Sequence, residues 1–266
     1  MNEKIFEQYN EFIQKEFEKN VDYIRTKEDY EATINKGRRD FEESLFEGHT
    51  IKEALIKSID NYGIDDLLDQ ALVICDMYLP YSLIELMHKL LDFKGISQKI
   101  DQKGMPEADR ATLINSFLGM HEKEEVIDYL INIVVTEESD LLKEEAINVL
   151  FKTNGQVVYD KINAFFEANG INDDLLGLLV KLDKSFLKDK DLLILLKERF
   201  LTTEDKALLA EIMADLNDGR AVTFLRGYLN KNKFKLSQSE IVDICSAISR
   251  MGGKTDDFIK PQNFMN

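Results

Sequence analysis

The chain has 266 residues, 44% of them hydrophobic and 32% charged, a composition that excludes an intrinsically disordered protein. No stretch approaches the ~20 consecutive apolar residues of a membrane-spanning helix, and the first residues lack the apolar segment of a secretory signal. We therefore expect a cytoplasmic protein without membrane association, in which Cys75 and Cys245 are reduced thiols inside apolar helices.

Charge is distributed unevenly along the chain, whose formal net charge is −16. Residues 1–60 carry 10 basic and 15 acidic side chains, residues 61–150 carry 7 and 18, and residues 151–266 carry 17 of each. Because an acidic surface repels nucleic acids and anionic membranes, we expect a basic patch only in the C-terminal part.

Three helices are predicted at the start of the chain, over residues 3–25, 27–47 and 51–62. The first has apolar side chains three and four residues apart, which places them on one face. Gly48 ends the second helix, and Thr50 with Glu53 forms a capping-box pattern at the start of the third. We expect residues 1–62 to form a helical cap on one end of a stack of repeats.

A hydrophobic pattern with a nearly fixed period follows Gly63. Fixed-period self-similarity is typical of stacked helical hairpins. We therefore predict an all-α fold, a right-handed α-α superhelix of about six helical hairpins that spans residues 63–266 as a continuous solenoid. Apolar helical segments end at equivalent positions, which lie 32, 32, 34 and 32 residues apart, at Leu118, Leu150, Leu182, Leu216 and Ile248.

Glycines are predicted to mark the boundaries between repeats, at Gly63, Gly95 and Gly170, each followed by an isoleucine. A glycine takes the left-handed conformation at the end of one helix, and a following Asp, Asn or Ser caps the next helix. The first anchor, Ile74, precedes Leu118 by 44 residues, so the polar stretch 96–106 is expected to be an insertion at a junction between units.

One unit carries a recognisable motif. Residues 207–229 combine an alanine-rich helix, an Asp-x-Arg-Ala-Val turn at 218–222 and a second helix that ends in leucine. This unit resembles a HEAT repeat, and more narrowly the short repeat of phycobilin-lyase-like proteins, with Asp218 and Arg220 at the positions of that family's turn residues. The resemblance implies a HEAT-like solenoid. Because such repeats serve adaptors, chaperone-like lyases and nucleic-acid binders alike, it supports the fold more than the function.

The stretch 220–235 holds five basic and no acidic residues, interleaved with aromatic side chains. Basic side chains pair with carboxylates or phosphates, and aromatic rings anchor peptides or stack on bases. In the alternative interpretation the rings pack against neighbouring helices and the lysines form a solvated turn. The candidate partner-binding residues are Arg220, Phe224, Arg226, Tyr228, Lys231, Lys233 and Lys235.

Motifs for catalysis or metal binding are incomplete. Glu85 and His88 supply only half of a di-iron Glu-x-x-His set, and His121 lacks the second histidine of a zinc helix. The sequence 252–255, Gly-Gly-Lys-Thr, lacks the rest of a phosphate loop and indicates a helix stop followed by a turn. We predict no catalytic residue, no metal and no cofactor, which favours a protein without enzymatic activity.

Three functions fit this sequence. The first is a non-enzymatic scaffold or adaptor that holds a protein or peptide on the inner-helix surface of the solenoid. The second is a HEAT-like protein that binds or processes nucleic acid through residues 220–235, although the net acidic charge opposes it. The third, a chaperone-type lyase, is implied by the repeat resemblance alone.

Overall fold

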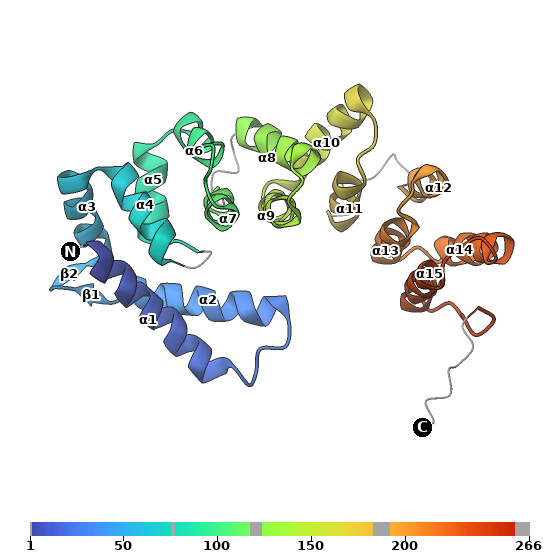
Figure 1. Ribbon diagram of the computed structural model, residues 1–266, viewed down its shortest axis with the longest axis horizontal. Helices are drawn as coiled ribbons and strands as arrows, with labels where there is room; N and C mark the ends of the chain where they lie inside the picture. Colours follow the sequence, from blue (N-terminus) through green and yellow to red (C-terminus); the bar gives the residue numbers. More distant parts are fainter. Residues whose placement is uncertain (1, 76–77, 118–123, 183–191, 259–266) are drawn as a thin grey trace. The chain divides into compact units, whose positions relative to one another are not determined.

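A computed structural model of the chain (Figure 1) describes residues 2–75, 78–117, 124–182 and 192–258. The described residues form fifteen helices and one two-stranded hairpin, which confirms the predicted all-α class. None of these helices has the length and apolar character needed to cross a membrane.

The helices divide between two compact units, residues 1–153 and 154–266. The first unit contains α1 (Asn2–Asn20), α2 (Lys27–Glu42), β1 (Leu45–Phe46), β2 (His49–Thr50), α3 (Ile51–Tyr62), α4 (Ile64–Ile74), α5 (Tyr81–Leu90), α6 (Phe93–Ile100), α7 (Glu107–Asn115), α8 (Glu124–Thr136) and α9 (Asp140–Phe151). The second contains α10 (Gly155–Asn169), α11 (Asp173–Lys181), α12 (Leu192–Thr202), α13 (Lys206–Leu216), α14 (Gly219–Asn232) and α15 (Gln238–Arg250).

In the first unit, the hairpin of α1 and α2 packs on the helices that follow it. Helix α1 contacts α4, so residues 1–62 and the helices after Gly63 share this unit. Tyr9 and Phe41 meet edge to face with ring centroids 5.2 Å apart, and the Tyr9 hydroxyl donates a hydrogen bond to the carbonyl of Tyr78. Further along the unit, α7 and α8 both pack against α9.

In the second unit the helices form two rows (Figure 1): α10, α12 and α14 in one, and α11, α13 and α15 in the other. Helix α13 packs against both α11 and α15. Its apolar residues Leu209, Ala210 and Met213 are therefore fully buried. These side chains pack between neighbouring helices at the high density of a protein interior.

The periodic anchor residues lie at the ends of helices, as the sequence predicted. Helices α4, α9, α11, α13 and α15 end at or within three residues of Ile74, Leu150, Leu182, Leu216 and Ile248. Leu118, the remaining anchor, is outside the described residues. Right-handed superhelical stacking across the whole chain stays a prediction.

The predicted second helix is too long. Helix α2 ends at Glu42, and residues 45–50 form a hairpin in which Leu45 pairs with Thr50 and Phe46 pairs with His49. Glu47 and Gly48 both have positive φ values, +50° and +82°, and this left-handed pair makes a tight turn between two strands. The first helix also ends early, at Asn20.

Two of the three predicted glycine boundaries are confirmed as helix ends, but a side chain caps the next helix only after Gly170, where Asn172 does so, because α4 begins directly after Gly63. Gly63 and Gly170 end α3 and α10 with φ values of +84° and +88°. Gly95 was predicted wrongly, because it lies inside α6, whose N-cap is Asp92. The Asp92 carboxylate accepts a hydrogen bond from the Gly95 N–H at 2.8 Å, so the helix begins before this glycine.

The insertion predicted at 96–106 includes the end of that short helix. After α6 the chain turns through Gly104, with φ of +89°, to Pro106, which precedes the first residue of α7. Proline is favoured at a helix start because no intrahelical partner exists there for an N–H group.

Gly37 permits the close crossing of α1 and α2. A Cβ atom at this position would lie 3.1 Å from Ile13 Cα and 3.3 Å from Phe12 O, both backbone atoms of α1. Only a glycine lets the two helices pack at this separation without a shift of the backbone.

We predict that Gly37→Ala destabilises the protein by about 1 kcal/mol, because overpacking of about 1–3 kcal/mol exceeds the gain of roughly 1 kcal/mol in helix propensity. The measurement is urea unfolding followed by circular dichroism. Gly227→Ala is the control, because a Cβ atom there meets nothing within 4 Å on α14. An equal gain in stability from both substitutions would contradict the tight crossing.

Candidate partner-binding surface

The predicted site residues 220–235 lie on α14 and in the turn that follows it. Asp218 is the N-cap of this helix and accepts a hydrogen bond from the Arg220 N–H at 2.9 Å. The Arg220 guanidinium folds back onto the same carboxylate, with Nη2 2.7 Å from Oδ2. These hydrogen bonds from Arg220 lower the pKa of Asp218. Arg220 therefore stabilises the start of α14. Its side chain is nevertheless largely exposed.

Phe224 and Tyr228 are partly buried against α12. The Phe200 ring meets both edge to face, with its centroid 5.5 Å from that of Phe224 and 4.9 Å from that of Tyr228. Burial also raises the pKa of the Tyr228 hydroxyl. These two rings fill the contact between α12 and α14, as the alternative interpretation of the sequence expected.

Arg226 binds the segment that follows α15. Its guanidinium donates hydrogen bonds to the carbonyl of Lys254 and to the carboxylate of Asp257, and lies 5.3 Å from the ring centroid of Phe258. The charge of Arg226 is thus compensated within the chain.

The end of α14 presents three lysines and an aromatic ring to solvent. Lys231, Lys233 and Lys235 are exposed, and Phe234 has 91% of its surface accessible. The Lys233 ammonium lies 5.3 Å from the Phe234 ring centroid. The structure therefore separates the predicted site into packing residues, paired arginines and this exposed basic cluster.

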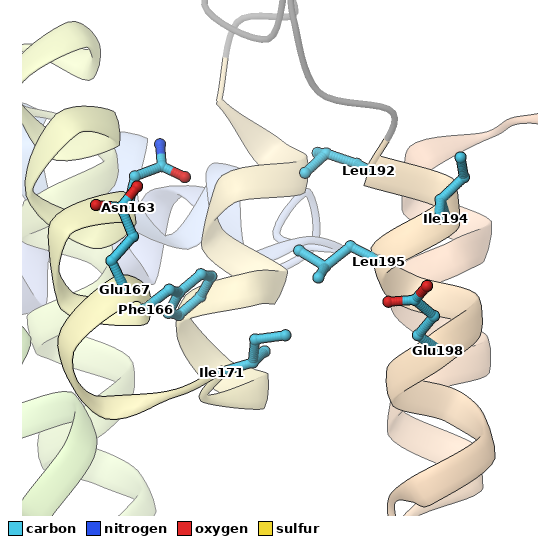
Figure 2. A pocket seen from close by; sticks show the side chains of 8 residues that line it. All are labelled: Asn163, Phe166, Glu167, Ile171, Leu192, Ile194, Leu195 and Glu198. Atoms are coloured by element: carbon cyan, nitrogen blue, oxygen red, sulfur yellow. The ribbon is translucent and has the colours of Figure 1, made fainter.

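A groove that the sequence analysis did not single out lies between α10 and α12, with a volume of about 360 Å³. Figure 2 shows Phe166 of α10 and Leu195 of α12 pointing toward one another, with Ile171 at one end of the space. Five of the eight lining residues are apolar, and the complete lining is Asn163, Phe166, Glu167, Ile171, Leu192, Ile194, Leu195 and Glu198.

The charged residues of this groove are both acidic. Glu167 lies on the α10 wall and Glu198 on the α12 wall, and both are exposed. Ile194 and Leu201, seven residues apart on one face of α12, are 56% and 60% exposed, with Lys197 and Glu198 between them on that face. The groove therefore combines an apolar floor with a carboxylate on either side.

A second cleft, of about 500 Å³, lies between α13 and α15 and is mainly polar. Its lining includes Asp205, Glu211, Asp243 and Arg250. Arg250 donates a hydrogen bond to Asp215 of α13 and lies 3.8 Å from Glu211. This cleft is bridged by ion pairs that join the two helices.

The incomplete catalytic motifs have structural roles. Glu85 accepts hydrogen bonds from Lys52 and Lys89, which lower the pKa of its carboxyl to about 2. His88 Nε2 lies 2.7 Å from the carbonyl oxygen of Ser116. Within residues 2–75, 78–117, 124–182 and 192–258, no three His, Cys, Asp or Glu side chains are grouped as metal ligands. His121 is outside these ranges.

The glycine pair after α15 forms a helix stop, as the sequence predicted. Gly252 has φ of +78°, and the N–H of Gly253 donates to the carbonyl of Ile248 at 2.9 Å. This backbone bond satisfies a carbonyl in the last turn of the helix.

Comparison of the chain with protein-family models, curated proteins and solved structures finds no match.

The groove was missed in the sequence because its apolar residues have the spacing of an ordinary core. Leu192 and Leu195 belong to the run Leu192-Leu193-Ile194-Leu195-Leu196, in which every face of the helix is apolar. Such a run indicates burial on all sides, although Ile194 has 56% of its surface exposed. The available signal in the sequence was Ile194, an apolar residue outside the stripe that a helix normally buries.

We predict that Asp218→Ala destabilises the second unit by about 1 kcal/mol at neutral pH, the usual cost of a lost N-cap. Asp218→Asn should cost less, because the amide oxygen still accepts the helix N–H. Since the folded-state pKa of Asp218 is lowered, its charge stabilises the fold above its unfolded pKa of about 4, and this contribution is lost as pH falls through the lower folded value.

Urea unfolding of both variants at neutral pH and at about pH 3 measures these losses. The deficit of the Asn variant relative to the wild type should shrink in acid. Equal deficits for the Ala and Asn variants at both pH values would show that Asp218 does not act as a cap.

Proposed function

We propose that this chain is a non-enzymatic scaffold that binds a protein or peptide partner. The observation that carries the proposal is the open apolar groove between α10 and α12, together with the exposed apolar residues Ile194 and Leu201 beside it. A groove with apolar side chains open to water is typical of an interaction site.

The chemistry of the groove supports binding. Its lining offers aliphatic and aromatic surface with three polar side chains, those of Asn163, Glu167 and Glu198. Burial of apolar area contributes roughly 25 cal/mol per Å², and a few well-packed aromatic or aliphatic anchors supply most of the energy of a protein interface.

A repeat architecture is part of the proposal. Helices follow one another along each unit, and alternate helices pack on one another, as α7 does on α9 and α13 on α15. These contacts support a HEAT-like solenoid of about six hairpins, capped by residues 1–62, which presents an extended surface to a partner.

The site proposed here differs from the candidate residues that the sequence suggested on α14. In the second unit, α11, α13 and α15 form one row, and the groove lies between two members of the other row. The rings of Phe224 and Tyr228 are already packed against Phe200.

Affinity capture after cross-linking, from extracts of the source cells, tests the scaffold function. We expect a protein partner whose recovery falls at least about tenfold with Ile194→Glu, because a charge on the groove removes apolar contacts of about 1–3 kcal/mol. Val242→Glu is the matched control, since Val242 is 42% exposed on α15 and outside the groove lining.

Two results would count against the proposal. One is the recovery of no protein above the background of an uncoupled matrix. The other is an equal loss of the partner with Ile194→Glu and with Val242→Glu, which would show that the groove has no special part in binding.

Nucleic-acid binding is the second candidate, favoured by the exposed cluster of Lys231, Lys233, Phe234 and Lys235. Lysines neutralise phosphates, and an exposed ring stacks on a base. Arg226, however, is bound to Asp257 within the chain, and the net charge is −16.

We therefore expect the wild-type chain not to retard single-stranded RNA in a gel at low salt, because long-range repulsion opposes the approach of a polyanion. The informative variant replaces Lys231, Lys233 and Lys235 with glutamate. A salt-sensitive retardation by the wild type that this variant abolishes would establish the second candidate instead.

A further inference from the structure

The groove between α10 and α12 is a candidate binding site for a single helix. Its walls are two helices, and the side chains of Phe166 and Leu195 point into the space between them (Figure 2). An amphipathic helix binds such a groove with its apolar face inward and anchors three, four and seven residues apart.

The exposed apolar residues of α12 indicate how long a bound partner helix must be. Ile194 and Leu201 are seven residues apart, which corresponds to about 10 Å, or two turns, along the helix. A partner helix of at least two turns is therefore needed to cover both apolar residues, and it would present an apolar stripe of the same length.

The charges of the groove favour a partner helix with basic side chains beside its apolar stripe. Glu167 and Glu198 lie on opposite walls, and the remaining lining residues are uncharged. A helix whose apolar stripe is flanked on both sides by Lys or Arg would place a cation beside each carboxylate. A helix flanked by acidic side chains would be repelled by both walls and by the net charge of −16.

We propose that the groove between α10 and α12 binds a basic amphipathic helix of a partner protein, with apolar anchors on Phe166, Ile171 and Leu195 and with Lys or Arg beside Glu167 and Glu198. This inference rests on the proposed scaffold function and specifies the chemistry of its partner. Charge pairs across the rim determine the rate of association and the choice of partner, whereas the apolar anchors supply most of the affinity.

A synthetic fluorescent peptide tests this inference. The probe is a helix of about 16 residues made of leucine and lysine, with leucines at the i, i+3, i+4 and i+7 positions that form one stripe. A second peptide has the same composition in an order that destroys the stripe. Both carry the same charge, so a difference between them reports the apolar face and not the acidity of the protein.

Binding is measured by fluorescence anisotropy with the full chain at about 0.1 M salt, where screening reduces long-range attraction. We expect the amphipathic peptide to bind at least about tenfold more tightly than the scrambled one. Glu167→Lys with Glu198→Lys should weaken its binding by at least about tenfold. The control, Glu138→Lys with Glu204→Lys, makes the same change of charge at exposed positions outside the groove and should have less than about a twofold effect.

Each opposite outcome overturns the inference. Equal binding of the two peptides, or equal weakening by the two double variants, would mean that only the net charge attracts the probe. If light scattering finds a dimer that Ile194→Glu dissociates, a second copy of the chain occupies the groove. Circular dichroism of every variant establishes that a loss of binding is not a loss of folding.

The affinity-capture experiment tests the scaffold function independently of the peptide experiment. A cellular partner whose capture requires Ile194, combined with no effect of the Glu167 and Glu198 reversal on the peptide, would leave the scaffold function in place and refute a basic helix. Failure of the capture experiment itself would refute the scaffold function, whatever the peptide does.

Discussion

Apolar packing between helices of successive pairs is the contact on which the rest of each unit depends. Helix α13 is the clearest case, since it packs on α11 and α15, and also on α12. Leu209, Ala210 and Met213 are completely removed from water there. A helix with this many neighbours has little surface left for solvent, so its sequence is apolar on several faces and its partners fix its position.

Buried polar groups in the first unit are accommodated by hydrogen bonds and ring contacts, although Arg38 Nε is buried without a hydrogen-bond partner among the described residues. Arg38 has only 5% of its surface accessible. Its guanidinium donates a hydrogen bond to the carbonyl of Leu79 at 2.7 Å and lies 3.8 Å from the ring centroid of Tyr81. Glu145, also buried, accepts a hydrogen bond from Asn115 at 3.0 Å. Burial of a charged group without such partners would cost several kcal/mol, on the order of the whole stability of a domain.

The groove arises where this packing leaves a helix partly uncovered. Helix α12 contacts α13, and its Phe200 receives the rings of Phe224 and Tyr228 from α14. On its other side, Leu195 points toward α10 across the groove, and Ile194 and Glu198 are exposed. The apolar character that buries one face of α12 continues onto a face that its neighbours do not cover, and this is the physical basis of the proposed binding site.

The sequence by itself determined the helical class, the ends of several helices and some of their caps. These features are local: Thr50 and Glu53 close a capping box, and Gly63 and Gly170 take positive φ values, because a helix end must satisfy its own free backbone groups. Tertiary structure decided the placement of the side chains. The spacing of Phe224, Tyr228 and Arg226 fits either an exposed surface or a core, and only the positions of Phe200 and Asp257 distinguish the two. The groove likewise exists because no other described helix covers Ile194. Which helix covers a given residue depends on contacts between distant segments, and no local sequence pattern encodes these.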